Sequence, residues 1–410
     1  MVESWLERAA RTRPHAPAVN DLTYAQLLDR ARRLRLDAGP GDRVALALAP
    51  GADFAVALHG VWLRGATAVP HDLRLPAADR PAADVVLDHA EPSGPPLPPG
   101  SRHDLDAVAL GLRTSGTTGP GKPVDLTFGN LLWSALGSAV LLGVDPADRW
   151  LCALPLSHVG GLSILARSAI YATAAAVLPG WDTERVAAEL RAGRASLVSL
   201  VPTTLARLLD DAALDRAPAL RWALLGGAPI PDVLLGRTPF PVAATYGLTE
   251  AASQVTTFGH PLFCTRVTLE ADGEILVAGP TVAPASGPLL RTGDLGAFDA
   301  GGRLRIVGRK ADTIVTGGEN VAPTEVEAVL EAHPAVAEAG VHGREDPEWG
   351  EAVVAVVVLR DGMRATAQEL RDHCAARLAR FQVPKDVRFA TVLPRTASGK
   401  LRRAGLKSCG

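Results

Sequence analysis

The hydrophobic residues of this chain fall into short apolar runs that are separated by stretches with helical spacing. Residues 3–13 and 23–36 carry apolar positions at intervals of three and four, and Thr23 is a residue type that commonly caps a helix. Residues 44–48 and 66–70 are apolar runs that predict buried strands, with a helix between them. This strand–helix–strand order indicates a parallel sheet with helices on its faces.

The alternation of predicted strands and helices continues to about residue 245, after which the hydrophobic pattern changes twice. Further strands are predicted at residues 84–87, 108–112, 149–153, 174–178, 197–201, 220–225 and 241–245, with helices near 130–142 and 183–192 and after residues 162 and 202. Residues 266–306 predict a mostly β segment, and the chain from residue 324 onward predicts a small α+β domain. We therefore expect an α/β protein with a large N-terminal domain of parallel-rich sheets flanked by helices, a β-rich subdomain and a small C-terminal domain.

Composition narrows the function classes without identifying one. A chain of 410 residues is too long for one ordinary core, so two or three domains are expected. The net charge of −2 does not indicate nucleic acid or an anionic membrane as a partner. The four cysteines are scattered, which predicts free thiols in a reducing cytoplasm. The N-terminus lacks a signal-peptide pattern and residues 151–178 are interrupted by charges and glycines, so we expect a cytoplasmic protein without a membrane-spanning helix.

Residues 113–124 combine glycines and hydroxyls in front of a lysine, directly after a predicted strand. Glycines let backbone N–H groups turn toward an anion, and the lysine adds a positive charge, so the stretch suits a polyphosphate. Its spacing also satisfies G-x-x-x-x-G-K, from Gly116 to Lys122, which is typical of a P-loop. A P-loop needs Ser or Thr after the lysine, whereas this chain has Pro123, which offers neither a hydroxyl nor an N–H.

The stretch instead resembles the phosphate loop of the adenylate-forming superfamily, which includes acyl-CoA synthetases, luciferases and peptide-synthetase adenylation domains. That loop usually reads T-S-G-T-T-G-x-P-K-G, and this chain departs from it at Pro120-Gly121 and at Pro123. The resemblance implies that the loop binds ATP through Thr114, Ser115, Gly116, Thr117, Thr118 and Lys122. A polar surface turn of similar composition is the alternative.

The segment Tyr246-Gly-Leu-Thr249-Glu250 resembles the Y-G-x-T-E motif of the same superfamily. Tyr246 offers a planar face for adenine, Thr249 offers a hydroxyl for the α-phosphate, and Glu250 offers a hard oxygen ligand for Mg²⁺. A carboxylate beside ATP phosphates is repulsive unless a cation lies between them, so the motif itself implies a metal. The alternative is a strand–turn with a surface glutamate.

Two further motifs are expected to surround the nucleotide. Gly227 and Ala228 follow a predicted strand, at the end where ligands of α/β sheets usually lie, and by resemblance they form the adenine wall. Thr292-Gly-Asp294 resembles the T-G-D motif, whose aspartate accepts hydrogen bonds from the ribose hydroxyls. By the same resemblance Arg309 is a second contact to the ribose and phosphate.

His158 and Lys400 complete the set of residues that the resemblance singles out. His158, in Leu154-Pro-Leu-Ser-His158-Val-Gly-Gly161, matches a P-L-x-H motif whose ring lies beside the acyl substrate, although a structural histidine is the alternative. Lys400 follows Gly399 near the C-terminus and matches the mobile lysine that completes the adenylation site, although a solvated surface lysine is the alternative.

The resemblance also implies a domain organisation. It predicts an N-terminal ATP- and acid-binding domain over residues 1–309, a hinge at residues 310–312 and a mobile C-terminal domain over residues 313–410. Rotation about the hinge would withdraw Lys400 and present the coenzyme A side of the small domain, which consists of Gly317, Gly318 and Glu319.

We therefore expect an AMP-forming carboxylate–CoA ligase that uses ATP and Mg²⁺, with coenzyme A as co-substrate. Three stretches resemble the branch that makes 2-succinylbenzoyl-CoA for menaquinone: residues 158–164, 199–209 and 249–254. Candidate polar contacts to the acid are His158, Gly161, Ser253, Gln254, Thr257 and Arg207, the last of which is equally explained as a solvated helix residue. The alternatives left open are another aryl or fatty acid, a carrier-protein thiol as acceptor, a nucleotide-binding protein without catalysis, and a homodimer.

Overall fold

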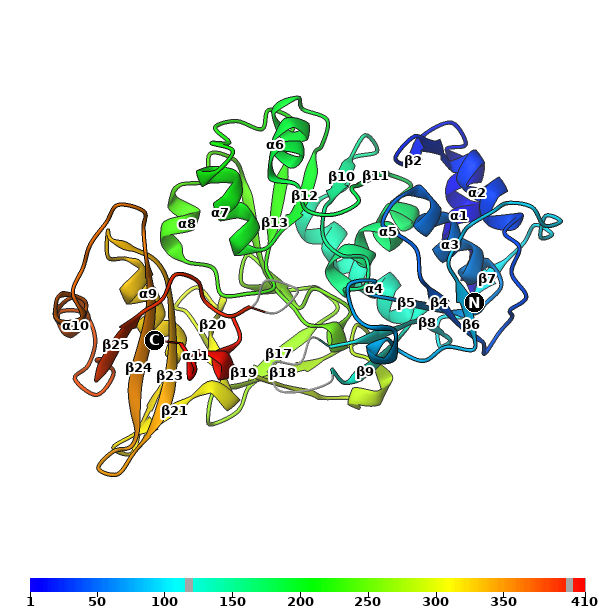
Figure 1. Cartoon of the computed structure of the whole chain (residues 1–410). Helices are drawn as coiled ribbons and strands as arrows, with labels where there is room; N and C mark the ends of the chain where they lie inside the picture. The colour runs from blue at the N-terminus through cyan, green and yellow to red at the C-terminus, as the bar shows by residue number, and fades with distance from the viewer. Residues whose placement is uncertain (115–120, 396–400, 410) are drawn as a thin grey trace.

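The computed structural model describes residues 1–114, 121–395 and 401–409. Two parallel-rich sheets and their helices make up the larger part of the molecule, and a small domain that contains the C-terminus lies at one end (Figure 1). A four-stranded antiparallel sheet lies between them in the sequence. This architecture confirms the predicted mixed α/β fold with a β-rich subdomain and a small C-terminal domain.

The larger sheet has nine strands in the order β16-β15-β14-β13-β12-β10-β11-β2-β3. Its strands are β2 (Pro17–Val19), β3 (Leu22–Thr23), β10 (Arg149–Cys152), β11 (Ala174–Val177), β12 (Leu197–Leu200), β13 (Trp222–Leu225), β14 (Val242–Tyr246), β15 (Thr256–Thr257) and β16 (His260–Pro261). The strands from β14 through β2 pair in parallel. The carboxyl ends of β10, β12, β13 and β14 therefore meet at one edge of the sheet.

The second sheet has the order β6-β4-β5-β8-β9. Its strands are β4 (Arg43–Leu46), β5 (Thr67–Pro70), β6 (Val85–Leu87), β8 (Val108–Arg113) and β9 (Pro123–Thr127). The first four pair in parallel, but β8 and β9 are antiparallel neighbours. The stretch between them therefore connects two strands of a hairpin, whereas a P-loop connects a strand to a helix. The hydrophobic pattern did not predict β9.

The helices of the larger part are α1 (Trp5–Thr12), α2 (Tyr24–Arg32), α3 (Ala52–Leu63), α4 (Phe128–Leu142), α5 (Val159–Tyr171), α6 (Thr183–Arg191), α7 (Pro202–Asp210) and α8 (Asp232–Gly236). Thr23 and Thr127 each cap a helix by accepting a hydrogen bond from the backbone three residues later. The cap at Thr127 explains why α4 begins two residues earlier than its apolar spacing predicts. Within the described part of the chain, no helix is long and apolar enough to cross a membrane.

The antiparallel sheet contains β17 (Arg266–Leu269), β18 (Glu274–Ala278), β19 (Leu290–Phe298) and β20 (Leu304–Arg309). A single 3₁₀ turn, η4 (Lys310–Asp312), leads from β20 to the C-terminal domain. That domain contains β21 (Ile314–Thr316), β22 (Glu319–Val321), β23 (Val336–Asp346), β24 (Gly350–Leu359) and β25 (Asp386–Phe389), with helices α9 (Pro323–Glu331), α10 (Ala367–Ala375) and α11 (Arg403–Leu406). The proposed hinge coincides with η4.

An aromatic cluster lies in the core beneath α1 and α3. The ring of His103 stacks on Phe128 at a centroid distance of 4.3 Å, and the ring of His59 meets the edge of Trp62 at 5.4 Å. Both histidines are buried. Burial lowers the pKa of His59 to about 4 and that of His103 to about 3, because a charged ring would lose its hydration there.

The two depressed pKa values predict a loss of stability in acid. The unfolded chain takes up protons below the unperturbed pKa of 6.5, whereas the folded protein does not until about pH 4. The free energy of unfolding should therefore be highest above pH 6.5 and should fall as the pH drops from 6.5 toward 4. At about 1.4 kcal/mol per proton and pH unit, His59 alone should account for about 2 kcal/mol at pH 5. Urea unfolding at pH 7 and pH 5 measures this loss. Between the two pH values, His59→Leu should lose about 2 kcal/mol less unfolding free energy than wild type, whereas the exposed His15→Leu control should lose as much as wild type. Equal losses in all three proteins would contradict this assignment.

Candidate active site

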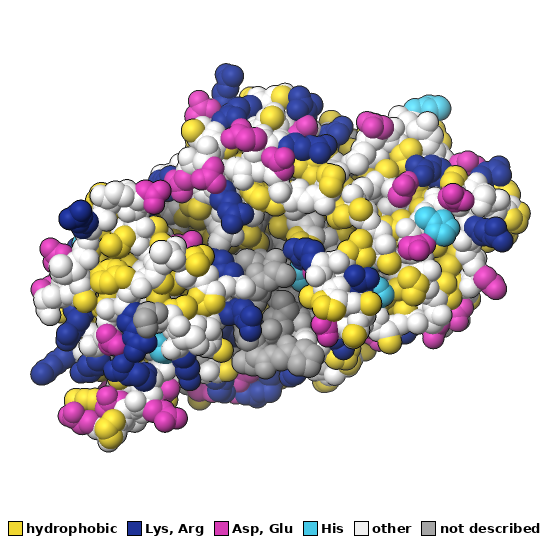
Figure 2. Space-filling view, viewed as in Figure 1, with side chains coloured by type: hydrophobic (Ala, Val, Ile, Leu, Met, Phe, Trp, Pro, Cys, Tyr) yellow, Lys and Arg dark blue, Asp and Glu magenta, His cyan; other side chains and the backbone are white. Residues whose placement is uncertain are grey.

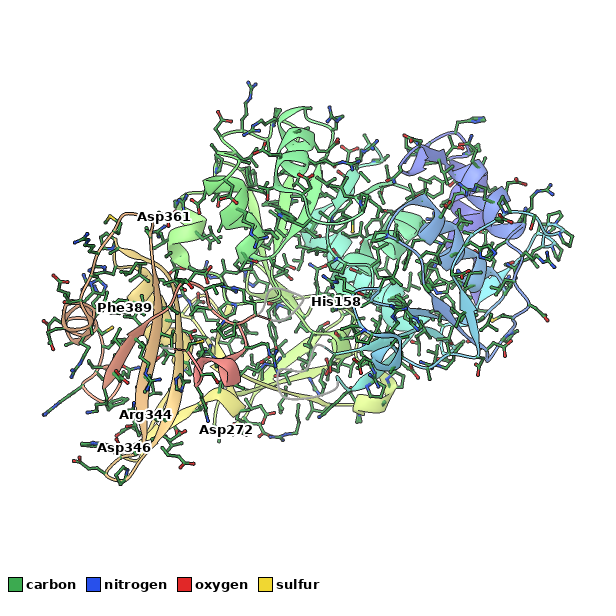
Figure 3. The ribbon with its side chains drawn as sticks, viewed as in Figure 1. His158, Asp272, Arg344, Asp346, Asp361 and Phe389 are labelled. Atoms are coloured by element: carbon green, nitrogen blue, oxygen red, sulfur yellow. The ribbon has the colours of Figure 1, made fainter. Side chains whose placement is uncertain are left out.

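Three of the candidate residues lie at the edge where the carboxyl ends of the parallel strands meet. His158 follows β10 and caps the start of α5, Gly227 follows β13, and Tyr246 is the last residue of β14. Gly226 packs so closely on β14 that a Cβ there would lie 2.6 Å from the carbonyl oxygen of Thr245. The Gly226-Gly227 backbone can therefore lie against the end of the neighbouring strand. In the view of Figure 3, His158 lies near the middle of the molecule.

Tyr246, Asp294 and Arg309 form one connected group. The phenol of Tyr246 donates a hydrogen bond of 2.7 Å to Oδ2 of Asp294, and Nε of Arg309 lies 2.7 Å from Oδ1 of the same carboxylate. Asp294 is buried on β19 directly opposite Arg309 on β20. Burial raises the pKa of Tyr246, and the charge of Asp294 raises it further, so the phenol remains a donor. The contact brings the predicted adenine and ribose residues together.

The chain after Tyr246 doubles back on itself before it reaches Gln254. A Cβ at Gly247 would lie only 1.6 Å from the carbonyl oxygen of Ser253, so glycine is required there. Ser253 itself has a φ of +95°, a strained value for a residue with a side chain. Thr249 and Glu250 lie on the 3₁₀ turn η2 (Thr249–Ala251) within this loop, and both are half-buried.

Glu250 is placed suitably for a cation. Its backbone carbonyl accepts a hydrogen bond from Ala283, which fixes η2 to the neighbouring loop, and β9 packs against η2. Among the residues that the structure describes, no lysine, arginine or histidine forms an ion pair with Glu250. A half-buried carboxylate without a cationic side chain beside it fits a divalent metal ligand. β9, the strand that follows the Gly-rich stretch, thus lies next to the turn that carries Glu250.

The base of the predicted phosphate loop is closed by contacts between Thr114 and Lys122. The N–H of Thr114 donates to the carbonyl of Lys122 at 2.9 Å, and the N–H of Lys122 donates to the Thr114 hydroxyl at 3.0 Å. A Cβ at Gly121 would lie 1.7 Å from the carbonyl oxygen of Thr114, which explains the glycine in front of the lysine. Ser115, Gly116, Thr117 and Thr118 lie outside the described residues.

The predicted acid-binding residues are only partly brought together. Gly161 lies in the first turn of α5, where a Cβ would be 2.5 Å from the carbonyl oxygen of Pro155, so the strand–helix turn is tightly packed around His158. Gln254 is buried, and its amide nitrogen donates to the Thr257 hydroxyl at 2.8 Å. No described residue donates a hydrogen bond to Oε1 of Gln254. Ala228 and Ser253 are half-buried.

Arg207 does not join this group. It is exposed on α7, and the described contacts do not connect it with the other candidates, so the solvated alternative fits its surroundings. Another arginine, which the sequence reasoning missed, is buried instead. Arg167 lies on α5, nine residues after His158. A charged residue within the otherwise uncharged and mostly apolar run of residues 162–170 was the available signal.

Arg167 has no counter-charge in the described part of the chain. Its guanidinium lies 3.2 Å from the hydroxyl of Ser134 and 5.6 Å from the ring centroid of Trp150, and no described carboxylate pairs with it. Burial lowers its pKa from the usual value, which is the effect of lost hydration. Ser134 in turn donates to the carbonyl of Ala252 at 2.6 Å, so Arg167 lies behind the loop that carries Ser253 and Gln254.

The coenzyme A side that was predicted on the small domain is an exposed turn. Gly317 and Gly318 have φ values of +59° and +86°, and Glu319 follows them at the start of β22. The ring of Trp349, another residue that the sequence reasoning missed, packs on Gly317, and Nζ of Lys385 lies 4.7 Å from its centroid. Lys and Arg side chains gather on this domain and along its border with the larger part (Figure 2). Lys400 lies outside the described residues.

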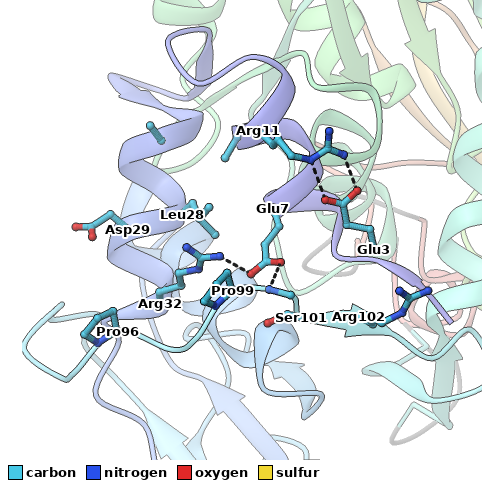
Figure 4. Close-up of a pocket in the computed structure, with 13 residues that line it drawn as sticks. Glu3, Glu7, Arg11, Leu28, Asp29, Arg32, Pro96, Pro99, Ser101 and Arg102 are labelled. Atoms are coloured by element: carbon cyan, nitrogen blue, oxygen red, sulfur yellow. Dashed lines mark hydrogen bonds and ion pairs between the residues drawn. The ribbon is translucent and has the colours of Figure 1, made fainter.

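Two other features are explained by internal pairing. Glu270, Asp272 and Glu274 are close enough to share a metal, but each already forms an ion pair with Lys310 or Arg291. A surface hollow of about 740 Å³ lies against α1, α2 and residues 96–102, away from every motif above (Figure 4). Two of its carboxylates pair within the hollow: Glu3 with Arg11 and Glu7 with Arg32. A third, Asp29, pairs with Arg33.

Comparison with known proteins finds similarity over nearly the whole chain. The family model described as AMP-binding enzyme matches residues 6–94 and 80–285, and the model described as AMP-binding enzyme C-terminal domain matches residues 325–400. A 2-succinylbenzoate–CoA ligase of Bacillus licheniformis is 35% identical, with 98% of each chain covered.

The similar solved structures include several of one Bacillus subtilis protein, o-succinylbenzoate CoA synthetase. The structure in complex with the acyl-adenylate intermediate OSB-AMP has a TM-score of 0.90 at 34% identity, covering 99% of this chain and 98% of that one. The structure with ATP and a magnesium ion has a TM-score of 0.88, covering 99% of both chains. A double mutant bound to the product analogue OSB-NCoA covers 100% of this chain and 98% of that one at a TM-score of 0.71.

The family models cover most of the chain, and a full-length relative exceeds 30% identity. Tyr246, at the end of β14, also contacts Asp294, which pairs with Arg309, so three of the residues that resemble the nucleotide motifs lie together. The chain therefore belongs to the AMP-binding enzyme family, as an adenylate-forming acid–CoA ligase.

Proposed function

We propose that the protein joins 2-succinylbenzoate to coenzyme A in two steps within one cleft. In the first step, a carboxylate oxygen of the acid attacks the α-phosphorus of ATP and pyrophosphate leaves, which gives an acyl-AMP. In the second step, the coenzyme A thiolate attacks the acyl carbon and AMP leaves. A free carboxylate is a poor acyl donor because its leaving group would be oxide, whereas AMP is a good leaving group. The work of the protein is positioning and charge compensation.

The observation that carries the choice of acid is the buried guanidinium of Arg167. An unpaired charge in the interior is costly, so a ligand that brings the opposite charge would be strongly favoured there. 2-Succinylbenzoate has two carboxylates, of which only one reacts, and the second would supply that charge. The apolar helix around Arg167 suits the aromatic ring. The full-length similarity to 2-succinylbenzoate–CoA ligases supports the same choice.

The nucleotide contacts follow from the site. Asp294 is held in place by Tyr246 and Arg309, so its carboxylate is preorganised to accept hydrogen bonds from ribose hydroxyls. The ring of Tyr246 and the Gly227-Ala228 backbone would enclose the adenine, and Thr249 would donate to the α-phosphate. Glu250 would hold Mg²⁺, which offsets the charge of the phosphates when it is bound. Lys122 and the hydroxyls of the Gly-rich loop would add donors to the β- and γ-phosphates.

The second step needs a different placement of the small domain. The same relative from Bacillus subtilis gives a TM-score of 0.90 in its acyl-adenylate complex and 0.71 in its OSB-NCoA complex, at equal sequence identity. This difference supports rotation of the domain about η4 between the two steps, with the present chain in the arrangement of the first. The turn of Gly317, Gly318 and Glu319 would then face the thiol channel.

The direct test is pyrophosphate exchange into ATP that depends on added 2-succinylbenzoate, followed by thioester formation when coenzyme A is supplied. Exchange with 2-succinylbenzoate and no thioester with coenzyme A would indicate a carrier-protein thiol as acceptor. If only a different aryl or fatty acid supports exchange, that acid is the substrate and the choice of 2-succinylbenzoate is wrong. If no acid supports exchange, the proposed ligase activity is contradicted.

Replacement of Arg167 should remove the preference of the enzyme for an acid that carries the second carboxylate over one that lacks it. Wild type should prefer 2-succinylbenzoate over 4-oxo-4-phenylbutanoate, which lacks the ring carboxylate, by about a hundredfold in kcat/KM, because a charged hydrogen bond contributes about 2–3 kcal/mol. Arg167→Met should reduce this ratio to a few-fold, whereas the exposed control Arg185→Met should keep it. An unchanged ratio in Arg167→Met would assign the buried arginine to packing alone.

Replacement of Lys400 should separate the two steps. Lys400→Ala should slow acyl-AMP formation about a hundred- to thousandfold, the usual effect of removing one group that stabilises transition-state charge. Thioester formation from supplied acyl-AMP should stay within a few-fold of wild type. Single-turnover measurements of each step distinguish these outcomes, and an equal loss in both would refute the proposed role.

Trp349 should act only in the second step. Its ring, with Lys385 on one face, would stack against the coenzyme A nucleotide, and such stacking contributes about 1–3 kcal/mol. Trp349→Ala should raise the KM for coenzyme A about tenfold and leave pyrophosphate exchange unchanged. Phe389→Ala is the matched control, because Phe389 is 41% exposed against 40% for Trp349 but lies away from this turn (Figure 3). Equal KM values in both variants would exclude Trp349 from the coenzyme A site.

A further inference from the structure

The chain on either side of residues 396–400 is anchored to the small domain. Arg395 forms an isolated antiparallel bridge with Leu401, and the N–H of Arg402 donates to the carbonyl of Pro394 at 2.8 Å. The ends of the segment that contains Lys400 are therefore held together. Arg395 also pairs with Glu338 on β23 at 2.7 Å.

The strongest anchor is Arg403, three residues after Lys400. Its Nε lies 3.0 Å from Oδ2 of Asp312 in the hinge, and its Nη2 lies 2.9 Å from Oε2 of Glu327 on α9. Its Nη1 contacts the other oxygen of Glu327 and donates to the carbonyl of Val341 on β23 at 2.8 Å. One guanidinium thus joins three separate elements to the helix that follows the lysine.

The contacts of Arg403 fix the position of its side chain in the small domain. The Arg403 side chain is only 16% exposed, and Glu327 also accepts a hydrogen bond from the N–H of Val341 at 2.8 Å, so neither partner is free to turn. The planar fork of arginine binds a carboxylate through two parallel hydrogen bonds and so sets direction as well as distance. Leu406 packs beside it on β23, where a Cβ at Gly340 would lie 2.9 Å from that leucine.

The hinge turn is held from both sides by opposite charges. At its start, Nζ of Lys310 lies 2.5 Å from Asp272 and 2.9 Å from Glu274, both in the antiparallel sheet of the larger part. At its end, Asp312 pairs with Arg403 of the small domain. The turn therefore has one ion-pair anchor in each domain, and only the second anchor leads to the segment that contains Lys400.

On the basis of the ligase chemistry proposed above, we propose that Arg403 is a positioning residue that couples the hinge to the lysine segment. Its contact with Asp312 fixes the start of α11 relative to η4, and the proposed role of Lys400 in the first step depends on that contact. Arg403 touches no substrate in this role. Its replacement should therefore impair the step that needs Lys400 and spare the step that does not.

The kinetic test compares the two steps with 2-succinylbenzoate as the acid. Arg403→Gln should lower the rate of acyl-AMP formation at least about tenfold with little change in the KM for ATP, and leave thioester formation from supplied acyl-AMP within about threefold of wild type. Arg403→Lys should recover part of the loss, since it keeps the charge but not the fork. The exposed neighbour provides the matched control, Arg402→Gln, which should match wild type in both steps.

A second measurement needs neither substrate nor a fully stable Arg403 variant. Asp312→Asn removes the charge of the hinge contact while the pairing of Arg403 with Glu327 remains. Hydrogen exchange of the full-length protein should then speed up about threefold or more in residues 394–406, with β23 and β24 unchanged. Unchanged exchange in residues 394–406 would overturn the coupling.

The outcomes separate this inference from the proposed function. Equal loss in both steps for Arg403→Gln would make Arg403 merely structural. Loss of acyl-AMP formation in Lys400→Ala without loss in Arg403→Gln would overturn the positioning role alone. If wild type gives no exchange with 2-succinylbenzoate, the substrate proposal fails, and the hydrogen-exchange result still decides whether Arg403 couples the hinge to the lysine segment.

Discussion

The hydrogen bond between Tyr246 and Asp294 joins the two halves of the proposed nucleotide site. Tyr246 ends a strand of the nine-stranded sheet, whereas Asp294 lies on the antiparallel sheet that leads to the hinge. The bond, together with the ion pair to Arg309, links the two sheets, and the loop after Tyr246 shares a hydrophobic cluster with the antiparallel sheet. Because the carboxylate is buried, its two partners also hold it at a fixed angle, and a buried charge without them would be costly.

Close backbone approach is the second constraint on the site. At Gly247 and Gly121 the space for a Cβ is taken by a carbonyl oxygen less than 2 Å away, so both turns depend on the missing side chain. The strained φ of Ser253 lies in the same loop. Strain of this kind costs about 1–3 kcal/mol and persists only where the surroundings enforce it. Here it keeps Thr249 and Glu250 beside β9, where the metal and the phosphates are proposed to bind.

Charge is distributed differently at the site and at the hinge. Around η4, carboxylates and cations are paired: Lys310 with the acidic turn of the antiparallel sheet, and Asp312 with Arg403. In the larger part, Glu250 and Arg167 have no described partner of opposite charge. Ion pairs suit a proposed hinge that must keep a defined arrangement, whereas charges without a partner of opposite sign suit residues that bind a charged ligand. The two patterns thus separate the residues that position the domains from those that would bind ATP, metal and acid.

The sequence by itself determined most of the longer strands and helices, the α/β class and the resemblance of the nucleotide motifs, because these depend on local periodicity and on residues adjacent in the chain. It did not predict β9, in which buried Val124 and Leu126 alternate with Asp125, since two apolar positions are too few to distinguish a strand from a loop. Nor did it identify Arg167, Trp349 or Arg403, whose surroundings come from segments far away in the chain. An arginine looks the same in sequence whether it is solvated, as Arg207 is, or buried, as Arg167 is. Only tertiary packing decides between the two, because hydration and counter-charge are properties of the folded surroundings.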